Sequence, residues 1–307
     1  MNHYGIMFHG FHHEIVDFGS SGTVSANVLD KAITKVGKKS ILSPEEWIER
    51  TVKGNLPNDS VCLTFDDGLR SQIDFALPVL ESHNLKAFWF VNSAPLNGLI
   101  QKLDVFRRFR FQNFSTVDEY YELFFLRLNP KITQEFSSQN YKEFLAKYQY
   151  KFPFYSINDI KYRFVRDLIL SRHEYEEMVT DLILEKGQTI EQLSEEIWIN
   201  KSDVAHLHSL GHEIGLHSFD HPTNMRSLSI SEQRYQYGQN HADLTQIVGS
   251  IRSAAHPCGS YSKETLQILK SLGVKVAFNS SLSKEIESKA KWINNLQMIR
   301  EDIANLK

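Results

Sequence analysis

The stretch Val61-Cys62-Leu63-Thr64-Phe65-Asp66-Asp67-Gly68 decides the fold of this chain. Its apolar, β-branched part predicts a buried strand, which ends abruptly in two adjacent carboxylates and a glycine. Ligands of an α/β protein bind at the carboxyl ends of its strands, so chemistry is expected at Asp66 and Asp67. On this segment alone a turn is the better interpretation, because Asp-Asp-Gly is also a common turn sequence.

The residues on either side predict a parallel sheet or barrel. Apolar residues recur at helical spacing over residues 73–80, and residues 87–91 form a second buried apolar run. Strand, helix and strand in this order make a βαβ unit, whose strands are parallel. An earlier apolar run over residues 6–8 predicts a first strand, which ends at His9.

The middle of the chain differs in composition from both ends. From about residue 97 to residue 203, glycine nearly vanishes and aromatic residues crowd together, for example at Phe106, Phe109 and Tyr120. A structureless connection of this length is implausible in a compact protein, so a mainly helical insertion with its own packing is expected. The chain is therefore predicted to be a single domain, residues 1–307, with the insertion 97–203 inside it.

Overall composition bounds the class of protein. Of 307 residues, 41% are hydrophobic and 23% charged, which is typical of a soluble globular protein. The net charge of −3 gives no global field that would draw the chain to nucleic acid or an anionic membrane. Two cysteines make no disulfide framework, the first residues lack a signal-peptide pattern, and no apolar run approaches the ~20 residues of a membrane span. A cytoplasmic enzyme or binding protein, with no nucleic-acid partner and no transmembrane segment, is expected.

A second motif supplies partners for the paired carboxylates. Residues 211–216 predict another strand, which runs directly into His217-Ser218-Phe219-Asp220-His221-Pro222. One helical turn would place His217 and His221 on the same side. Two imidazoles and one carboxylate from the first motif leave open positions for water and substrate, which suits Zn²⁺ or another borderline divalent metal acting on a carbonyl. Alone, the histidines would be interpreted as satisfied polar residues, but beside the carboxylates a metal site is the better interpretation.

These motifs resemble the signatures of a known family. Thr64-Phe65-Asp66-Asp67-Gly68 and His217-Ser218-x-x-His221-Pro222 look like the first two signatures of the polysaccharide deacetylase family, carbohydrate esterase family 4. Residues 87–91, residues 211–215 and Pro257-x-Gly259 are lesser matches to its second strand, its approach to the histidine motif and its third signature. The resemblance covers roughly residues 1–95 and 205–307. It implies an α/β fold, a distorted (β/α) barrel of the polysaccharide deacetylase type, here with a large helical insertion.

The resemblance also implies roles for particular residues. In the family the second aspartate of the first motif and both histidines bind the metal, which here are Asp67, His217 and His221. The implied cofactor is one divalent metal ion, with Zn²⁺ as the preferred assignment. The first aspartate, Asp66, would be the general base that activates the attacking water. The third signature would supply a backbone N–H, here from Cys258, to the developing oxyanion.

The chain departs from the usual family pattern in two places. The arginine before Pro-x-Gly is missing, with Ala255 and His256 in its place, and no Leu-x-His motif is found after Tyr261. The chain is more similar to a branch of the family that begins with a strand ending in Tyr-His and ends with an Arg-x-Asp element. The corresponding residues here are Phe8-His9 and Arg300-Glu301-Asp302.

These departures change which residues are expected to act. His9 is the candidate acid, because an expelled amine must be protonated and histidine titrates near neutral pH. Arg300 is expected to orient the carboxylates, and we place it with Cys258 and Tyr261 among the candidate substrate-binding residues.

The resulting prediction is a metal-dependent hydrolase that removes an N-acetyl group from an amino sugar of a cell-surface glycan or its precursor. A cytoplasmic address would favour a small sugar, a sugar nucleotide or a lipid-linked precursor as substrate. Two alternatives stay open: a metal-dependent hydrolase of a non-sugar amide or cyclic imide, and a catalytically inactive carbohydrate-binding relative. An inactive relative would be expected to lack the base or a ligand, yet all four residues of the two motifs are present. The oligomeric state cannot be predicted.

Overall fold

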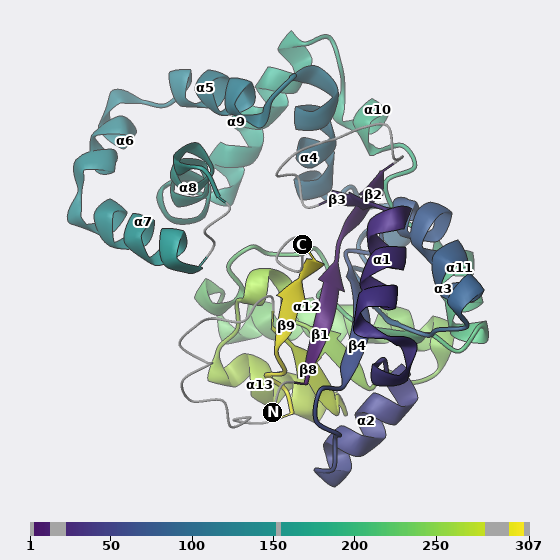
Figure 1. The fold of residues 1–307 in the computed structure, drawn as a ribbon. Helices are drawn as coiled ribbons and strands as arrows, with labels where there is room; N and C mark the ends of the chain where they lie inside the picture. The colour runs from purple at the N-terminus through teal and green to yellow at the C-terminus, as the bar shows by residue number, and fades with distance from the viewer. Residues whose placement is uncertain (1–2, 13–22, 152–154, 280–294, 304–307) are drawn as a thin grey trace. The chain divides into compact units, whose positions relative to one another are not determined.

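The computed structural model describes residues 3–12, 23–151, 155–279 and 295–303. These residues fall into two compact units (Figure 1). One unit is the continuous segment Ile100–Glu195, and the other is formed by the described residues before and after it. We call them the helical unit and the barrel unit. All the candidate site residues named above belong to the barrel unit.

The sheet of the barrel unit has seven parallel strands in the order β8-β7-β6-β5-β4-β1-β9. They are β1 (Tyr4–Phe8), β4 (Val61–Asp66), β5 (Phe88–Val91), β6 (Glu213–Leu216), β7 (Ser253–Ala255), β8 (Val276–Phe278) and β9 (Arg300–Asp302). The two edges approach each other, because Phe278 of β8 pairs with Met298, which lies just before β9. The sheet is thus a nearly closed barrel, and the predicted distorted (β/α) barrel with a helical insertion is confirmed.

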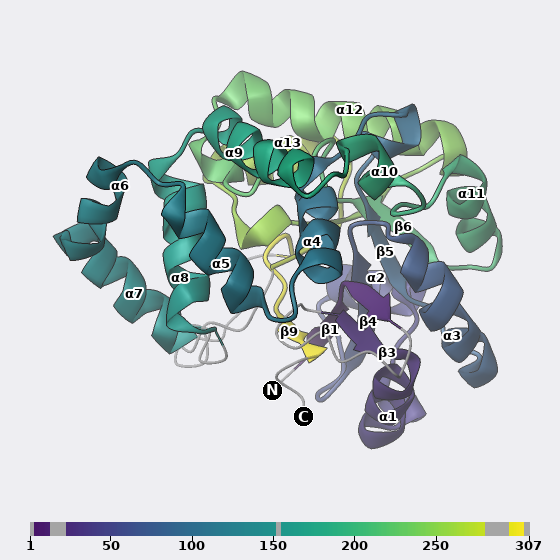
Figure 2. The same cartoon turned by 90° about the horizontal axis from the view of Figure 1, so that it is seen from above.

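Helices connect the parallel strands and cover the outside of the barrel. Figure 2 shows α3, α11 and α12 on the outer side of β4, β5 and β6. The helices of this unit are α1 (Ala26–Val36), α2 (Pro44–Lys53), α3 (Leu77–His83), α11 (Lys201–Ser209), α12 (Ile230–Val248) and α13 (Lys263–Ser271). Two short strands, β2 (Gly10–His12) and β3 (Thr23–Ser25), pair in a separate small sheet. Across the described part of the chain, no helix is both long enough and apolar enough to span a membrane.

Side chains alternate between the two faces of each strand, and this alternation sorts the core. Leu63, Phe65 and Trp89 lie on the outer face, in one large cluster with residues of the covering helices. Cys62 and Phe90 lie on the opposite face, in a second cluster inside the barrel. Polar groups that continue this inner face beyond the apolar residues therefore point into the barrel at the carboxyl ends of the strands.

The helical unit builds its own core from aromatic rings. Its helices are α4 (Lys102–Asn113), α5 (Val117–Leu126), α6 (Pro130–Gln134), α7 (Gln139–Lys151), α8 (Ile157–Phe164), α9 (Arg172–Glu185) and α10 (Ile190–Ser194). The ring of Tyr162 packs against those of Tyr120, Tyr121 and Phe124. Nη1 of Arg110 donates a hydrogen bond to the Tyr162 hydroxyl at 2.9 Å. The crowded aromatic residues therefore pack mainly against one another.

Candidate active site

Asp66 is the last residue of β4, and only 2% of its surface is exposed. A carboxylate removed from water needs a cation and hydrogen bonds. Arg300, the first residue of β9, supplies both, since its Nη1 and Nη2 donate to Oδ1 and Oδ2 of Asp66 at 2.6 and 2.7 Å. β4 and β9 are the two neighbours of β1 (Figure 1). The bidentate ion pair therefore spans β1 and ties three strands together at the site.

Further contacts fix the guanidinium of Arg300. Its Nε donates to the carbonyl oxygen of Asn279 at 2.6 Å, and its Nη1 also donates to the hydroxyl of Thr64 at 3.3 Å. Its central carbon lies 5.6 Å from the centre of the Phe90 ring. Burial raises the pKa of Asp66, but the positive charge and hydrogen bonds of Arg300, together with the charges of His217 and His9, outweigh burial and hold that pKa below its usual range. Asp66 is therefore ionised at neutral pH.

Asp67, His217 and His221 form a compact buried cluster of the type that binds metal ions. Nε2 of His217 and Nε2 of His221 each lie 3.3 Å from Oδ1 of Asp67. One possible ligand atom from each residue lies within 4.8 Å of those of the other two. In a tetrahedral zinc site with bonds of about 2.0–2.2 Å, neighbouring ligand atoms are roughly 3.3–3.6 Å apart. The spacing of the three residues fits such an ion.

Left-handed backbone conformations aim these side chains. Asp67, Ser218 and His221 have φ of 76°, 66° and 54°, values that are uncommon and unfavourable for residues other than glycine. The Ser218 hydroxyl accepts a hydrogen bond from the backbone N–H of His221 at 3.2 Å. The segment between the histidines is a bend and contains no helix. The expected single helical turn is therefore wrong, although the two imidazoles do lie together.

The orientation of His217 favours a cation between the imidazoles and the carboxylate. Its Nδ1 lies 3.0 Å from the carbonyl oxygen of Ala255, to which it donates, and its backbone N–H donates to Oδ1 of Asn240 at 3.0 Å. In the neutral ring, Nε2 then carries a lone pair facing Asp67, which is repulsive unless a metal cation or a proton lies between them. Burial lowers the pKa of His217, but the carboxylates of Asp66 and Asp67 raise it more, so the net change is upward. The donor set thus fits a divalent metal.

His9 follows β1 and faces the carboxylate of Asp66. Its Nε2 lies 4.0 Å from Oδ2 of Asp66, and 27% of its side chain is exposed. Completely buried Gln72 ties the two residues together, since its Nε2 donates to the carbonyl oxygens of His9 at 2.9 Å and of Asp66 at 2.6 Å. Its Oε1 accepts from the N–H of Leu69 at 3.3 Å. The sequence did not identify Gln72, and its sole signal was a polar residue at the start of an apolar helical pattern.

Cys258 and Tyr261 lie in the loop that follows β7. Cys258 is exposed and left-handed, with φ of 51°. The ring of Tyr261 stacks on that of His256 with 4.4 Å between centres, and its hydroxyl accepts from Nε2 of Gln297 at 2.9 Å. The loop begins directly after Ala255, whose carbonyl orients a metal-ligand candidate. The structure thus gathers both aspartates, His9, Arg300 and the two histidines, and connects this loop to them through β7.

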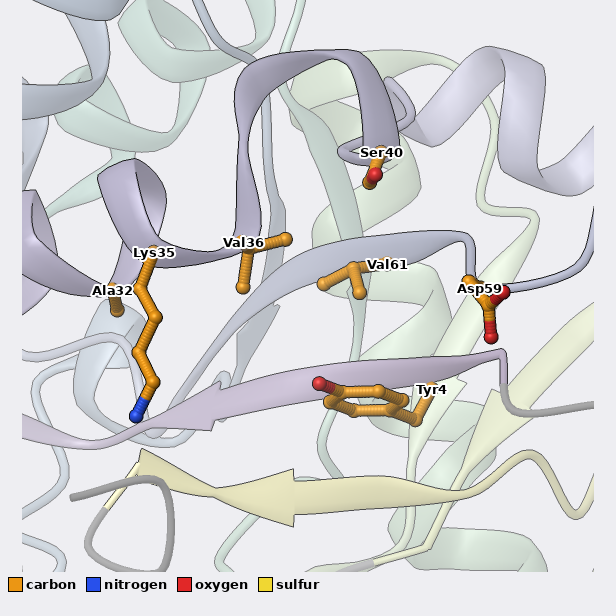
Figure 3. Close-up of a pocket in the computed structure, with 7 residues that line it drawn as sticks. All are labelled: Tyr4, Ala32, Lys35, Val36, Ser40, Asp59 and Val61. Atoms are coloured by element: carbon orange, nitrogen blue, oxygen red, sulfur yellow. The ribbon is translucent and has the colours of Figure 1, made fainter.

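A separate pocket lies at the other end of the strands (Figure 3). It has a volume of about 420 Å³, and its lining includes Tyr4, Val61, Lys35 and Asp59. Tyr4 and Val61 are the first residues of β1 and β4 and pair with each other. The pocket is therefore at the amino ends of these strands, whereas Asp66 lies at a carboxyl end, and it contains none of the candidate site residues.

Comparison with known proteins establishes the family. The sequence model of the polysaccharide deacetylase family matches residues 53–108 and 136–277, which is more than half of the chain. The chain belongs to the polysaccharide deacetylase family, as its motifs predicted. This membership supports the predicted enzyme class, a hydrolase that removes N-acetyl groups from carbohydrate. No curated protein matches the sequence.

Solved structures with similar folds include several deacetylases. The deacetylase PplD of Streptococcus pyogenes, solved in complex with acetate, has a TM-score of 0.55 and 15% identity, over 99% of this chain and 95% of its own. A de-N-acetylase from Aggregatibacter actinomycetemcomitans has a TM-score of 0.56 and 14% identity, over 98% and 95%. IcaB from Ammonifex degensii has a TM-score of 0.54 and 13% identity, over 98% and 91%. At these identities the comparison shows a shared fold.

Proposed function

We propose that this protein is a metal-dependent carbohydrate N-deacetylase, which hydrolyses the N-acetyl group of an amino sugar in a cell-surface glycan or its precursor. The observation that carries the proposal is an ionised Asp66, held by Arg300, beside the buried metal-ligand cluster. Oδ2 of Asp66 lies 3.9 Å from Nε2 of His217. We further propose that residues 1–307 form one catalytic domain, with residues 97–203 as an insertion in it.

Asp67, His217 and His221 would hold one divalent ion, and Zn²⁺ is preferred because imidazoles and carboxylates are its usual ligands. A bound ion supplies Lewis-acid polarisation of the acyl carbonyl and lowers the pKa of water. Burial raises the pKa of Asp67, but His221 and His217 lower it well below its usual range, so Asp67 is available as an anionic ligand. The carbonyl of Ala255 keeps Nε2 of His217 directed toward the same point.

Asp66 acts as the general base in this proposal. Both of its oxygens accept hydrogen bonds from Arg300, which fixes the plane of the carboxylate and keeps it ionised. Oδ2 is also the oxygen closest to His217 and His9. This oxygen therefore takes the proton from the water that attacks the acyl carbon.

His9 acts as the general acid. Amide cleavage expels an amine, which is a poor leaving group until its nitrogen is protonated. His9 is partly exposed and its Nε2 lies 4.0 Å from Oδ2 of Asp66, so it is both beside the base and open to solvent. Its Nε2 donates the proton to the departing nitrogen.

Residues of the loop after β7 complete the substrate site in this proposal. The backbone N–H of Cys258 donates to the oxygen on which charge develops, as the third family signature implies. Tyr261, which His256 and Gln297 hold in place, contributes a ring for packing against a sugar. Arg300 acts on the substrate indirectly, because it is completely buried against Asp66.

The proposal is tested by acetate release from N-acetylated amino-sugar oligomers and by metal analysis of the same preparations. Asp66→Asn should keep about one metal ion per chain and lose turnover by ~10²–10⁴-fold, the range typical of a general base. His217→Ala should lose the ion, since it removes a ligand. Absence of acetate release from metal-loaded protein on every such oligomer would refute the function. Loss of the ion in Asp66→Asn would instead show that Asp66 is a metal ligand, and Asp67 would then be the candidate base.

A further inference from the structure

The carboxyl end of β5 carries a polar residue without an assigned role, Asn92. β5 lies between β4 and β6 (Figure 2), and Phe90 of β5 is level with Asp66 on one side and Gly215 on the other. Continuing this register by two residues places Asn92 level with His217. Two residues is also the repeat of side-chain direction, so Asn92 continues the inner face of Phe90. Asn92 therefore lies level with His217, a metal-ligand candidate, and two residues beyond the level of Asp66 on the neighbouring strand.

The carboxamide of Asn92 is buried and has no hydrogen-bond partner. Its exposed fraction is 1%, and neither Oδ1 nor Nδ2 has a partner among the residues that the structure describes. Asn240 offers a direct comparison, because it is 0% exposed yet has a hydrogen bond at each of its two polar side-chain atoms. Its Oδ1 accepts from His217 at 3.0 Å and its Nδ2 donates to the carbonyl of Val91 at 2.9 Å. Buried amides are normally satisfied in this way, so an amide with neither bond calls for a partner from outside the protein chain.

We propose that Asn92 binds the acyl group of the substrate, with Nδ2 donating a hydrogen bond to the acyl oxygen. This inference rests on the proposed function. As water adds to the acyl carbon, the π electrons of the carbonyl move onto that oxygen, and a hydrogen-bond donor held beside it stabilises the charge. The remaining Oδ1 accepts a hydrogen bond from water or from a sugar hydroxyl. Asn92 is thus a catalytic residue in addition to Asp66 and His9.

The first test compares Asn92→Leu with Asn240→Leu. Both variants remove a buried carboxamide of the same size, but only Asn240→Leu breaks hydrogen bonds found in the described structure. Asn92→Leu should keep its melting temperature within about 2 °C of the wild type or exceed it, while Asn240→Leu should fall by at least 2–4 °C. Turnover of Asn92→Leu should fall by ~10²–10³-fold, as for loss of one oxyanion donor. A fall in melting temperature like that of Asn240→Leu, or failure to fold, would make Asn92 a structural residue and overturn the proposal.

The second test uses acetate, the acyl product, and needs no turnover. Calorimetric titration of acetate into metal-loaded protein should give at least tenfold weaker binding for Asn92→Leu than for the wild type. Asn92→Asp keeps the shape but replaces the donor by a carboxylate, and it should weaken acetate binding further through repulsion. Unchanged acetate affinity in either variant would overturn the proposal. Weakened acetate affinity in both variants would support acyl binding by Asn92 even if no amino sugar proved to be a substrate. Failure of this inference can therefore be distinguished from failure of the proposed function.

Discussion

The adjacent carboxylates of Asp66 and Asp67 have different roles because each faces different side chains. Strand geometry directs Asp66 to Arg300, and the left-handed backbone of Asp67 directs the next carboxylate to the histidines. Each carboxylate thus has its own cationic or metal-binding partner, which removes the repulsion that two neighbouring anions would otherwise suffer. Arg300 is therefore the main cation that keeps the candidate base ionised.

Replacing Arg300 should change the pH at which the base titrates. In Arg300→Met the positive charge is lost while burial stays, so the pKa of Asp66 should rise from its present low value. A base with a higher pKa is protonated at higher pH, and the acid limb of the kcat/KM profile should move upward. An unpaired buried carboxylate also costs ~3–5 kcal/mol, so the melting temperature should fall. Arg300→Lys, which keeps a charge, should lie between Arg300→Met and the wild type in both measurements. An acid limb that stays in place would show that the limb reports another group.

Replacing His9 should affect substrates according to their leaving groups. His9→Ala should keep its metal and fold, because His9 is partly exposed and outside the ligand cluster. Its turnover should fall by ~10²–10⁴-fold on an N-acetyl sugar, whose amine must be protonated, and by much less on an activated acetate ester. Parallel rate measurements on the two substrates decide this. Equal losses on both would remove His9 from proton transfer.

At the scale of elements, a π-helical turn, Gln72–Ala76, connects the first motif to α3. Pro78, the second residue of α3, has no N–H to donate to the preceding turn, and a wider turn accommodates that loss. The turn brings the side chain of Gln72 beneath the ends of β1 and β4, where it bonds the carbonyls of His9 and Asp66. The element therefore fixes the separation of the candidate acid and base.

Gln72→Leu should reduce turnover by roughly 10–100-fold, because small displacements of aligned groups cost that much. Metal content should not change, since the hydrogen bonds of the Gln72 side chain go to Leu69, His9 and Asp66, none of which is a metal-ligand candidate. Gln233→Leu is a matched control: Gln233 is also buried, at 2% exposure, and bonds Leu228 and Thr265 away from the site. It should lose stability but keep its turnover. If both variants keep turnover, Gln72 has no positioning role.

For the molecule as a whole, the sequence predicted the parts that depend on neighbouring residues. The apolar run ending at Asp66 and the strand before His217 were found as predicted, and they determine the barrel. Gln72 and Asn92 were not foreseen, because their importance depends on register between strands or on a turn type that a single sequence does not display. The sequence alone did not predict the ion pair between Arg300 and Asp66. Only the family resemblance suggested that Arg300 orients the carboxylates.

Stability of the whole chain should decrease in mild acid because of His212. This residue is 2% exposed, and its Nδ1 accepts from the N–H of Ala87 at 3.1 Å. Burial, with Lys86, lowers its pKa from 6.5 to about 4. Below pH 6.5 the unfolded chain binds a proton that the folded chain excludes until about pH 4, so stability falls as pH falls through that window. The loss is about 1.4 kcal/mol per pH unit.

Urea unfolding at pH 7 and pH 5 measures this effect. The wild type should lose about 2 kcal/mol more than His212→Asn, whose side-chain oxygen can still accept from Ala87 but cannot titrate. Equal losses in the two proteins would assign the acid sensitivity to other groups.

The ion pair between Asp66 and Arg300 also has a consequence during synthesis on the ribosome. The two residues are 234 positions apart. At translation rates of about 5–20 residues per second, Arg300 is synthesised roughly 10–50 s after Asp66. Until then, closing the barrel around Asp66 would bury an uncompensated charge, so the nascent chain should leave this end of the barrel open. Catalytic competence is thus acquired late, when the chain has grown beyond Arg300.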